Sequence, residues 1–187
     1  MIETGRLILR EWHDDDAMAM YDLGRDARVM EYLGPLNTLD EAQALVAGQI
    51  VNQSLFGHCF WPIERRADGM LLGYCGLNVV PNGSPLEDEI EIGWLLASAV
   101  WGQGYAREAA EAALCWAWAH LEKPRIVGFT VPANRRSRGL MERLGMTRRH
   151  ALDFGHPDIP PGHPLHDHIT YAIDRASRDE EGQTGAG

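Results

Sequence analysis

The sequence lacks any long apolar segment. At its N-terminus only Leu7–Leu9 are consecutive apolar residues before charged side chains resume, which is too short for the apolar region of a signal peptide. No stretch approaches the roughly 18 apolar residues that a membrane-spanning helix needs. We therefore expect a soluble cytoplasmic protein with no membrane partner.

Cysteine and positive charge are also scarce. The three cysteines, Cys59, Cys75 and Cys115, lie far apart and form no CxxC pair, so we expect small buried side chains rather than a disulfide framework or a zinc site. The 17 basic residues against 27 acidic ones give a net charge of −10. Because nonspecific nucleic-acid binding depends on clustered cations, we expect no nucleic-acid partner.

The length and the composition fit a single domain. The chain has 187 residues, of which 45% are apolar, enough for one hydrophobic core. We place this domain at residues 1–175. Residues 176–187 are polar and contain no aromatic side chain, so we expect a disordered tail there.

Hydrophobic periodicity and capping residues predict alternating strands and helices. We expect a helix capped within Asp14–Asp16 that runs through about Leu23, and a helix from Thr38 with Ala42, Leu45, Val46 and Ile50 on one face. We expect two more helices, over 106–121 and from Asn134 to Gly145. We expect strands over 6–12, within 58–66 and 70–80 as a hairpin, 89–97, 125–131 and within 168–173. This order predicts an α/β fold with a central mixed sheet flanked by helices.

The segment Gly102-Gln103-Gly104 lies between an expected strand and the Ala-rich helix. Small residues let the backbone turn tightly and expose its N–H groups, and a helix N-terminus favours anions, so the loop is a candidate phosphate site. It is neither GxGxxG nor a P-loop ending in GK[ST], and a plain strand-to-helix turn is the alternative. A nucleotide-binding phosphotransferase is a second, weaker alternative because a Walker lysine is missing.

A second candidate region is VPANRRSRG. Asn134 stands at a helix start, Ser137 follows one turn later, and Arg135, Arg136 and Arg138 surround them in an otherwise acidic chain. Positive potential is therefore concentrated there. The alternative is an ordinary capped helix with solvated arginines.

Together these segments resemble the GCN5-related N-acetyltransferase (GNAT) superfamily, in its RimJ/RimL-like branch, over residues 2–174. The acetyl-CoA signature maps onto residues 101–106, where Gly104 and Ala106 match and Trp101 departs from the commonest residue. The resemblance implies the GNAT fold and acetyl-CoA as cosubstrate, without a metal. It implies cofactor-binding roles for Trp94, Leu95, Leu96, Gly102, Gln103, Gly104, Tyr105, Ala106, Arg107, Asn134 and Ser137.

The resemblance also implies acetyl transfer to a primary amine, either a protein N-terminus or a small molecule, by direct attack in a ternary complex. Many members carry a tyrosine acid where this chain has Met141, and Ser137 is the candidate replacement. Glu91 is the candidate general base, and Glu89 shares its expected strand face, so alternation does not choose between them. A non-catalytic acyl-CoA-binding module is the alternative function.

The remaining polar clusters are assigned weaker roles. His156, His163, His166 and His168 lie in a proline-rich loop with unspecified metal geometry, so we expect a substrate-loop role or a proton relay rather than a metal site. Cys115 is expected beside the Ala-rich core, which disfavours an acyl-enzyme. Residues 30–37 and 154–168 are expected around the acceptor, and acidic residues 87–89 could attract a cationic amine. The sequence leaves the choice between monomer and homodimer open.

Overall fold

The predicted hairpin belongs to the first of two compact units. The computed structural model describes residues 1–34, 38–80 and 83–175. The first unit comprises residues 1–78 and 92–116, and the second comprises residues 79–91 and the chain from 117 onward. In the hairpin, β3 (Phe60–Arg65) pairs antiparallel with β4 (Leu71–Val79), and Gly69 in the turn has a φ of +70°. The hairpin prediction is confirmed.

The strand predicted over residues 6–12 is observed only at Leu7–Leu9, and an additional short strand precedes it. β1 (Ile2–Glu3) pairs antiparallel with β2 (Leu7–Leu9), which pairs antiparallel with β3. Our expectation of a strand over 6–12 is therefore wrong at both ends. Arg10 N–H still donates to the carbonyl of Pro62, 3.2 Å away, but proline has no N–H with which to continue the ladder.

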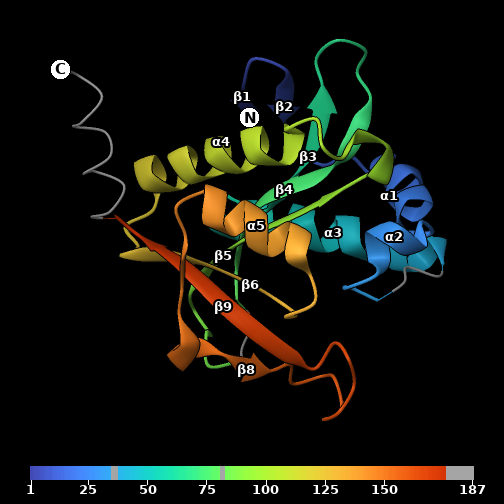
Figure 1. Ribbon diagram of the computed structural model, residues 1–187. Coiled ribbons are helices and arrows are strands. Elements are labelled where there is room, and N and C mark those ends of the chain that lie inside the picture. Colours follow the sequence, from blue (N-terminus) through green and yellow to red (C-terminus); the bar gives the residue numbers. More distant parts are fainter. Residues whose placement is uncertain (35–37, 81–82, 176–187) are drawn as a thin grey trace. The chain divides into compact units, whose positions relative to one another are not determined.

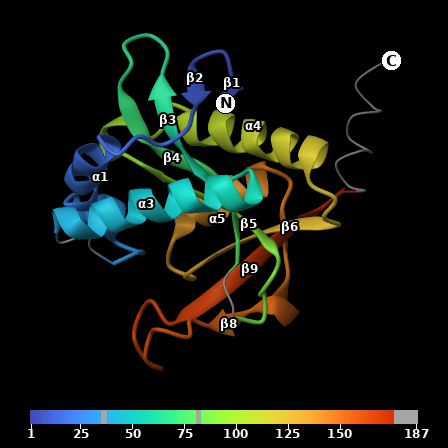
Figure 2. The same cartoon turned by 180° about the vertical axis from the view of Figure 1, so that it is seen from behind.

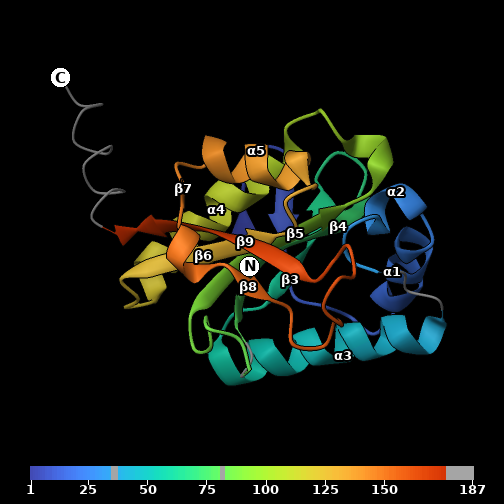
Figure 3. The ribbon, with the colours of Figure 1, turned by 60° about the horizontal axis from the view of Figure 1, so that its bottom comes forward.

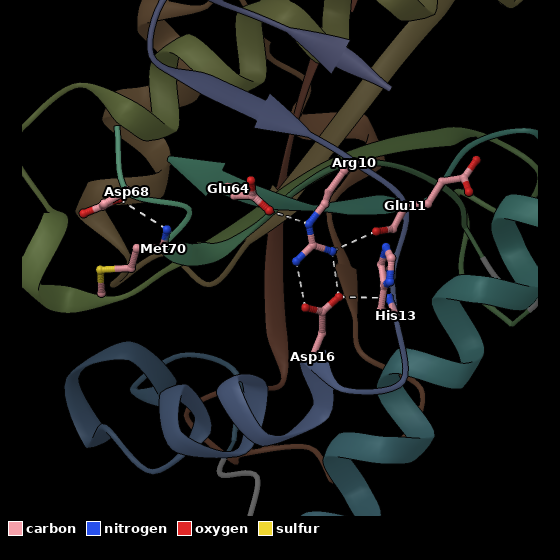
Figure 4. Close-up of polar contacts among 7 residues, drawn as sticks. All are labelled: Arg10, Glu11, His13, Asp16, Glu64, Asp68 and Met70. Atoms are coloured by element: carbon pink, nitrogen blue, oxygen red, sulfur yellow. Dashed lines mark hydrogen bonds and ion pairs between the residues drawn. The ribbon is translucent and has the colours of Figure 1, made fainter. Parts of the chain in front are cut away.

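A buried ion-pair network replaces the cap expected at Asp14–Asp16. α1 (Asp16–Gly24) begins without a side-chain cap, because Asp16 instead accepts two hydrogen bonds of 2.8 Å from the Arg10 guanidinium and one of 2.9 Å from His13 N–H. Arg10 also donates to Glu64, 2.8 Å away (Figure 4). Burial acts to raise the pKa of Asp16. The hydrogen bonds from Arg10 and His13 N–H, together with the charge of Arg10, outweigh burial and lower this pKa.

We expect Arg10→Met to lower the free energy of unfolding by about 2–4 kcal/mol, because it leaves the poorly exposed Asp16 carboxylate without its cation. Since the pKa of Asp16 is lowered, its stabilising contribution is present above its unfolded pKa and is lost as pH falls through the folded value. Urea unfolding at neutral and acid pH measures both effects. Arg28→Gln, which removes an exposed ion pair with Asp26, is the control and should change stability by under about 1 kcal/mol. Equal losses in both variants would contradict this account.

The capping box at Thr38 forms as predicted. Thr38 accepts a hydrogen bond from Glu41 N–H, and Glu41 accepts one from Thr38 N–H, at the start of α3 (Leu39–Phe56). Ala42 and Val46 are buried, whereas Ile50 is 36% exposed, so the predicted apolar face ends one turn early. The first unit also contains α2 (Ala27–Met30), which we did not predict. Figures 1 and 2 show α1 and α3 side by side.

The next strand and helix carry the phosphate-loop candidate. β5 (Ile90–Leu96) is followed by a short 3-10 helix, η1 (Ser98–Val100), and by α4 (Tyr105–His120). Most of the predicted apolar stripe of α4 is buried, namely Ala109, Ala110, Ala113, Leu114 and Ala117. Cys115 is exposed, contrary to our expectation, because it lies about half a helical turn from that stripe. Cys59 and Cys75 are buried as predicted.

The second unit is built on β6 (Arg125–Thr130) and β9 (Asp167–Asp174), and the whole of β6 pairs antiparallel with residues 169–174 of β9. β5 joins β6 in parallel at Glu91 and Val127. Two short strands that we did not predict, β7 (Thr147–Arg148) and β8 (Phe154–Gly155), pair with β9, as Figure 3 shows for β8. The unit also contains α5 (Arg135–Arg143) and η2 (His150–Leu152).

The strand pairings confirm an α/β fold with a mixed sheet. In the first unit the order is β1-β2-β3-β4-β5, and in the second it is β5-β6-β9-β7. The parallel pair is β5–β6, and every other pairing given above is antiparallel. The expected tail at 176–187 and part of the expected acceptor segment, 35–37, lie outside the described residues. No helix in the described ranges is long and apolar enough to cross a membrane.

Candidate functional site

The loop before α4 presents a row of backbone donors. Gly102 and Gly104 have φ angles of +75° and +84°, which only glycine adopts without strain, and α4 begins at Tyr105. Glu108 N–H donates to the carbonyl of Gly104, 3.1 Å away, and is the first donor of α4 with a carbonyl partner in the chain. Among the described residues, no acceptor is found for the N–H groups from Gly102 to Arg107. Such a row at a helix N-terminus suits an anion.

The side chains of this loop are held by neighbouring groups. Gln103 donates through its amide to the carbonyl of Ala99, and Arg107 forms an exposed pair with Glu111, 2.9 Å away. The Tyr105 side chain is buried. The side chains of Gln103 and Arg107 are thus engaged with neighbouring groups, whereas the backbone N–H groups of the loop are not.

Sequence analysis missed two residues between β1 and β2, namely Thr4, which contacts α4, and Arg6, which contacts both α4 and the loop. Thr4 donates to a Glu108 carboxylate oxygen 2.6 Å away, and Arg6 donates to both Glu108 oxygens and to the carbonyl of Gln103, 3.0 Å away. No local pattern could have revealed these contacts, because they join residues about a hundred positions apart.

The end of β5 lies next to β4 in the first unit. Ala97 N–H donates to the carbonyl of Leu72, and the Leu95 carbonyl lies 2.0 Å from the position that a Cβ on Gly73 would occupy. Only glycine at 73 permits this approach. Leu95 and Leu96 are buried while Trp94 is half-buried, so the predicted alternation, with Trp94 on the face of Ile90 and Ile92, fails after Gly93. The Leu96 carbonyl accepts from the Trp101 indole, 2.8 Å away.

The structure distinguishes the two candidate carboxylates, which both lie in the second unit. Glu89 accepts two hydrogen bonds from Arg125, the shorter of 2.5 Å, so its charge is neutralised. The Glu91 carboxyl group has no hydrogen bond or ion pair among the described residues. Burial raises the pKa of Glu91 to about 8. A carboxyl group that titrates near neutral pH and has no cationic partner is suited to take up a proton.

Asn134 and Ser137 form the cap of α5. Asn134 Oδ1 accepts from Ser137 N–H, 3.2 Å away, and its amide donates to the hydroxyls of Ser137 and Thr130, each 3.1 Å away. The Ser137 hydroxyl therefore accepts from the amide and keeps its own proton for another partner. Met141 is buried and cannot donate a proton.

The histidine loop is occupied by its own contacts. His168 stacks on Phe154 with ring centroids 5.3 Å apart, and burial lowers its pKa. His166 Nδ1 lies 2.6 Å from the Ile159 carbonyl. Within the described ranges, no group of three or more His, Cys, Asp or Glu side chains could hold a metal ion.

Comparison with known proteins places these features in one family. Residues 6–147 match the family model described as "Acetyltransferase (GNAT) domain". The uncharacterized N-acetyltransferase YnaD of Bacillus subtilis is 31% identical over 92% of this chain and 95% of its own. A GNAT-family acetyltransferase structure from Bacillus anthracis, 26% identical, superposes with a TM-score of 0.76 over 94% of this chain and 98% of its own. The structure of RimL, a ribosomal L7/L12 alpha-N-protein acetyltransferase in complex with coenzyme A, is 18% identical and has a TM-score of 0.74 over 91% of this chain and 95% of its own.

The mixed sheet and the glycine loop at the head of α4 define a GNAT-type acyltransferase fold. The chain belongs to the GNAT acetyltransferase family.

Proposed function

We propose that the protein transfers the acetyl group of acetyl-CoA to a primary amine, with both substrates bound at once. The observation that carries this proposal is the row of unpartnered N–H groups from Gly102 to Arg107, which suits the CoA pyrophosphate. We further propose that the backbone of Trp94–Leu96 hydrogen-bonds the pantetheine amides. The family membership and the CoA bound to RimL support acetyl-CoA as the donor.

We propose Glu91 as the general base. The attacking amine must lose a proton, and the uncharged form of an alkylamine with a pKa of about 10.4 costs about 4.6 kcal/mol at pH 7, against about 1–1.4 kcal/mol for an α-amine. The nitrogen attacks the thioester carbonyl, its proton passes to the Glu91 carboxylate, and the C–S bond breaks to release CoA. The raised pKa and the absence of a cationic partner support Glu91 over Glu89 in this role.

We propose that Ser137 hydrogen-bonds the departing CoA sulfur and relays a proton to it, while solvent water replaces the serine proton in the same step. Its hydroxyl is fixed by the Asn134 amide and retains a proton to donate. Ser137→Ala is expected to lower kcat about tenfold or more through the loss of this donor. Thr130→Val is the matched control, since it removes the other hydroxyl bound by the same Asn134 amide. Equal rates in the serine variant and the wild type, measured as CoA release at saturating substrates, would exclude this role.

The acceptor class follows from weaker observations. RimL is an alpha-N-protein acetyltransferase, and we propose the RimJ/RimL-like branch, with a peptide α-amine or a small amine as acceptor. The acidic segment 87–89 attracts cations less than its sequence indicates, because Glu89 is paired with Arg125.

The proposal is tested by incubating the protein with acetyl-CoA and a panel of N-terminal peptides, polyamines and amino sugars. We expect free CoA and an equal amount of N-acetyl product with at least one amine. Binding of acetyl-CoA without thioester loss across the panel would favour the non-catalytic alternative. A thermal shift with CoA at 100 times its Kd should correspond to about 2.7 kcal/mol of stabilisation. A shift with ATP alone would favour a phosphotransferase.

A further inference from the structure

The segment between β1 and β2 is hydrogen-bonded to Glu108 in the first turn of α4. Thr4 Oγ1 donates to Glu108 Oε1, 2.6 Å away, and Arg6 N–H donates to the same oxygen, 2.9 Å away. Arg6 Nε and Nη2 both lie 2.7 Å from Glu108 Oε2. Both carboxylate oxygens are therefore held, and Glu108 is 20% exposed.

The same arginine also contacts the glycine loop. Arg6 Nη1 donates to the Gln103 carbonyl, 3.0 Å away, and its guanidinium lies 4.4 Å from the centre of the Tyr105 ring. A Cβ on Gly104 would lie 3.4 Å from Arg6 Nη2. One side chain thus connects the helix carboxylate, the loop carbonyl and the loop aromatic ring.

Arg6 neutralises the negative charge of Glu108 close to the proposed phosphate site. Its carboxylate lies in the first turn of α4, beside the N–H groups proposed to bind the doubly charged pyrophosphate. An unpaired carboxylate there would repel the ligand. Burial acts to raise the pKa of Glu108, but the hydrogen bonds from Thr4 and Arg6 outweigh it and lower the pKa, so Glu108 stays ionised at neutral pH and needs its cation.

We propose that Arg6 is a positioning residue for CoA: it neutralises Glu108 and fixes the Gln103 carbonyl, so that the N–H groups of the loop stay available to the pyrophosphate. This inference rests on the proposed use of that loop for CoA. It assigns Arg6 a role in recognising the phosphate part of the donor and none in recognising the acetylpantetheine part.

The proposal is tested with Arg6→Met, Glu108→Gln and the double variant, together with two donors. For Arg6→Met we expect the Kd of CoA by calorimetry to rise about tenfold, as one unpaired charge near the phosphates predicts at an effective dielectric constant of about 20. In the double variant the repelling charge is absent but the contact with the Gln103 carbonyl is also lost, so we expect a Kd between those of Arg6→Met and the wild type. The kcat/KM for S-acetylpantetheine, which lacks the phosphates, should stay unchanged in all variants.

Arg66→Met is the matched control. Arg66 Nη1 donates to the Thr4 carbonyl, 2.8 Å away, so Arg66 holds the same turn, and among the described residues it has no hydrogen bond or ion pair with the loop. The Kd of CoA should stay near the wild-type value in this variant. Arg6→Lys keeps the charge but not the forked donors, and an intermediate Kd is expected; this variant also serves if Arg6→Met does not fold.

The outcomes separate the two proposals. Wild-type protein that binds no CoA would overturn the proposed function itself. Wild-type protein that binds CoA, with an unchanged Kd in Arg6→Met and Arg6→Lys, would overturn the role of Arg6 alone. Equal losses with CoA and S-acetylpantetheine, or a double variant as weak as Arg6→Met, would also overturn it.

Discussion

Glu91→Gln is expected to lower kcat by about 10²- to 10⁴-fold, the range for loss of a general base. Glutamine keeps the shape of the side chain but cannot accept the amine proton. Because Glu91 is not assigned to CoA binding, the Kd of CoA should change little. Single-turnover rates of CoA release at saturating amine, with calorimetry of CoA binding, measure the two quantities separately.

The pH dependence of the wild-type rate also tests whether Glu91 is the general base. Burial raises the pKa of Glu91 to about 8, and only the ionised carboxylate accepts a proton. The rate should therefore be low below pH 7, rise through about pH 8 and level off above it. In Glu91→Gln, measured with the same acceptor, the limb near pH 8 that belongs to Glu91 should be lost and only the ionisation of the amine should remain. An alkylamine acceptor with a pKa of about 10.4 keeps the two limbs apart.

Glu89→Gln is the matched control for the base. Glu89 lies two residues before Glu91 but is already bound to Arg125, so its replacement should affect stability more than kcat. A large loss of kcat in Glu89→Gln with normal rates in Glu91→Gln would reverse the assignment. Equal rates in all three proteins would remove both carboxylates from the mechanism.

Gly104→Val is expected to raise the Kd of CoA about 5- to 30-fold. With a φ of +84° at this position, a β-branched residue costs about 1–2 kcal/mol of strain, which the loop can relieve only by leaving the binding conformation. The new Cβ would also lie 3.4 Å from Arg6 Nη2. Calorimetry with CoA measures the loss of affinity.

Gly69→Val is the control for this strain. Gly69 has a φ of +70° in the β3–β4 turn, and nothing lies within 4 Å of its Cβ position. Both valine variants should lose similar stability, whereas only Gly104→Val should lose CoA affinity. Similar CoA affinities in the two variants would show that the loop conformation is not used for binding.

Local signals made much of the fold predictable. The capping box at Thr38, the turn at Ala67–Gly69 and the cap at Asn134 each depend on residues within a few positions of one another, and each forms as expected. The tight turn at Gly102–Gly104 is also a local feature, and it forms with positive φ angles at both glycines. Where the local signal was weaker, at Asp14–Asp16, the Asp16 carboxylate instead binds Arg10, which directly follows β2.

The details of the site depended on contacts that no local pattern encodes. Strand alternation put Glu89 and Glu91 on the same face, and only the position of Arg125 across the β5–β6 pair separates them. The contacts of Arg6 with Glu108 and Gln103 depend on tertiary structure in the same way. The two-residue strands β7 and β8 form because they pair with β9, and two residues are too few to show a strand pattern in the sequence.

The central claim is direct transfer in a ternary complex, and two-substrate kinetics test it most directly. Initial rates of CoA release should be measured over a matrix of acetyl-CoA and amine concentrations with an acceptor identified from the panel. The account predicts double-reciprocal lines that intersect, with no acetylated protein detectable by mass spectrometry in the absence of amine. Parallel lines, with an acetyl group on the protein, would contradict it.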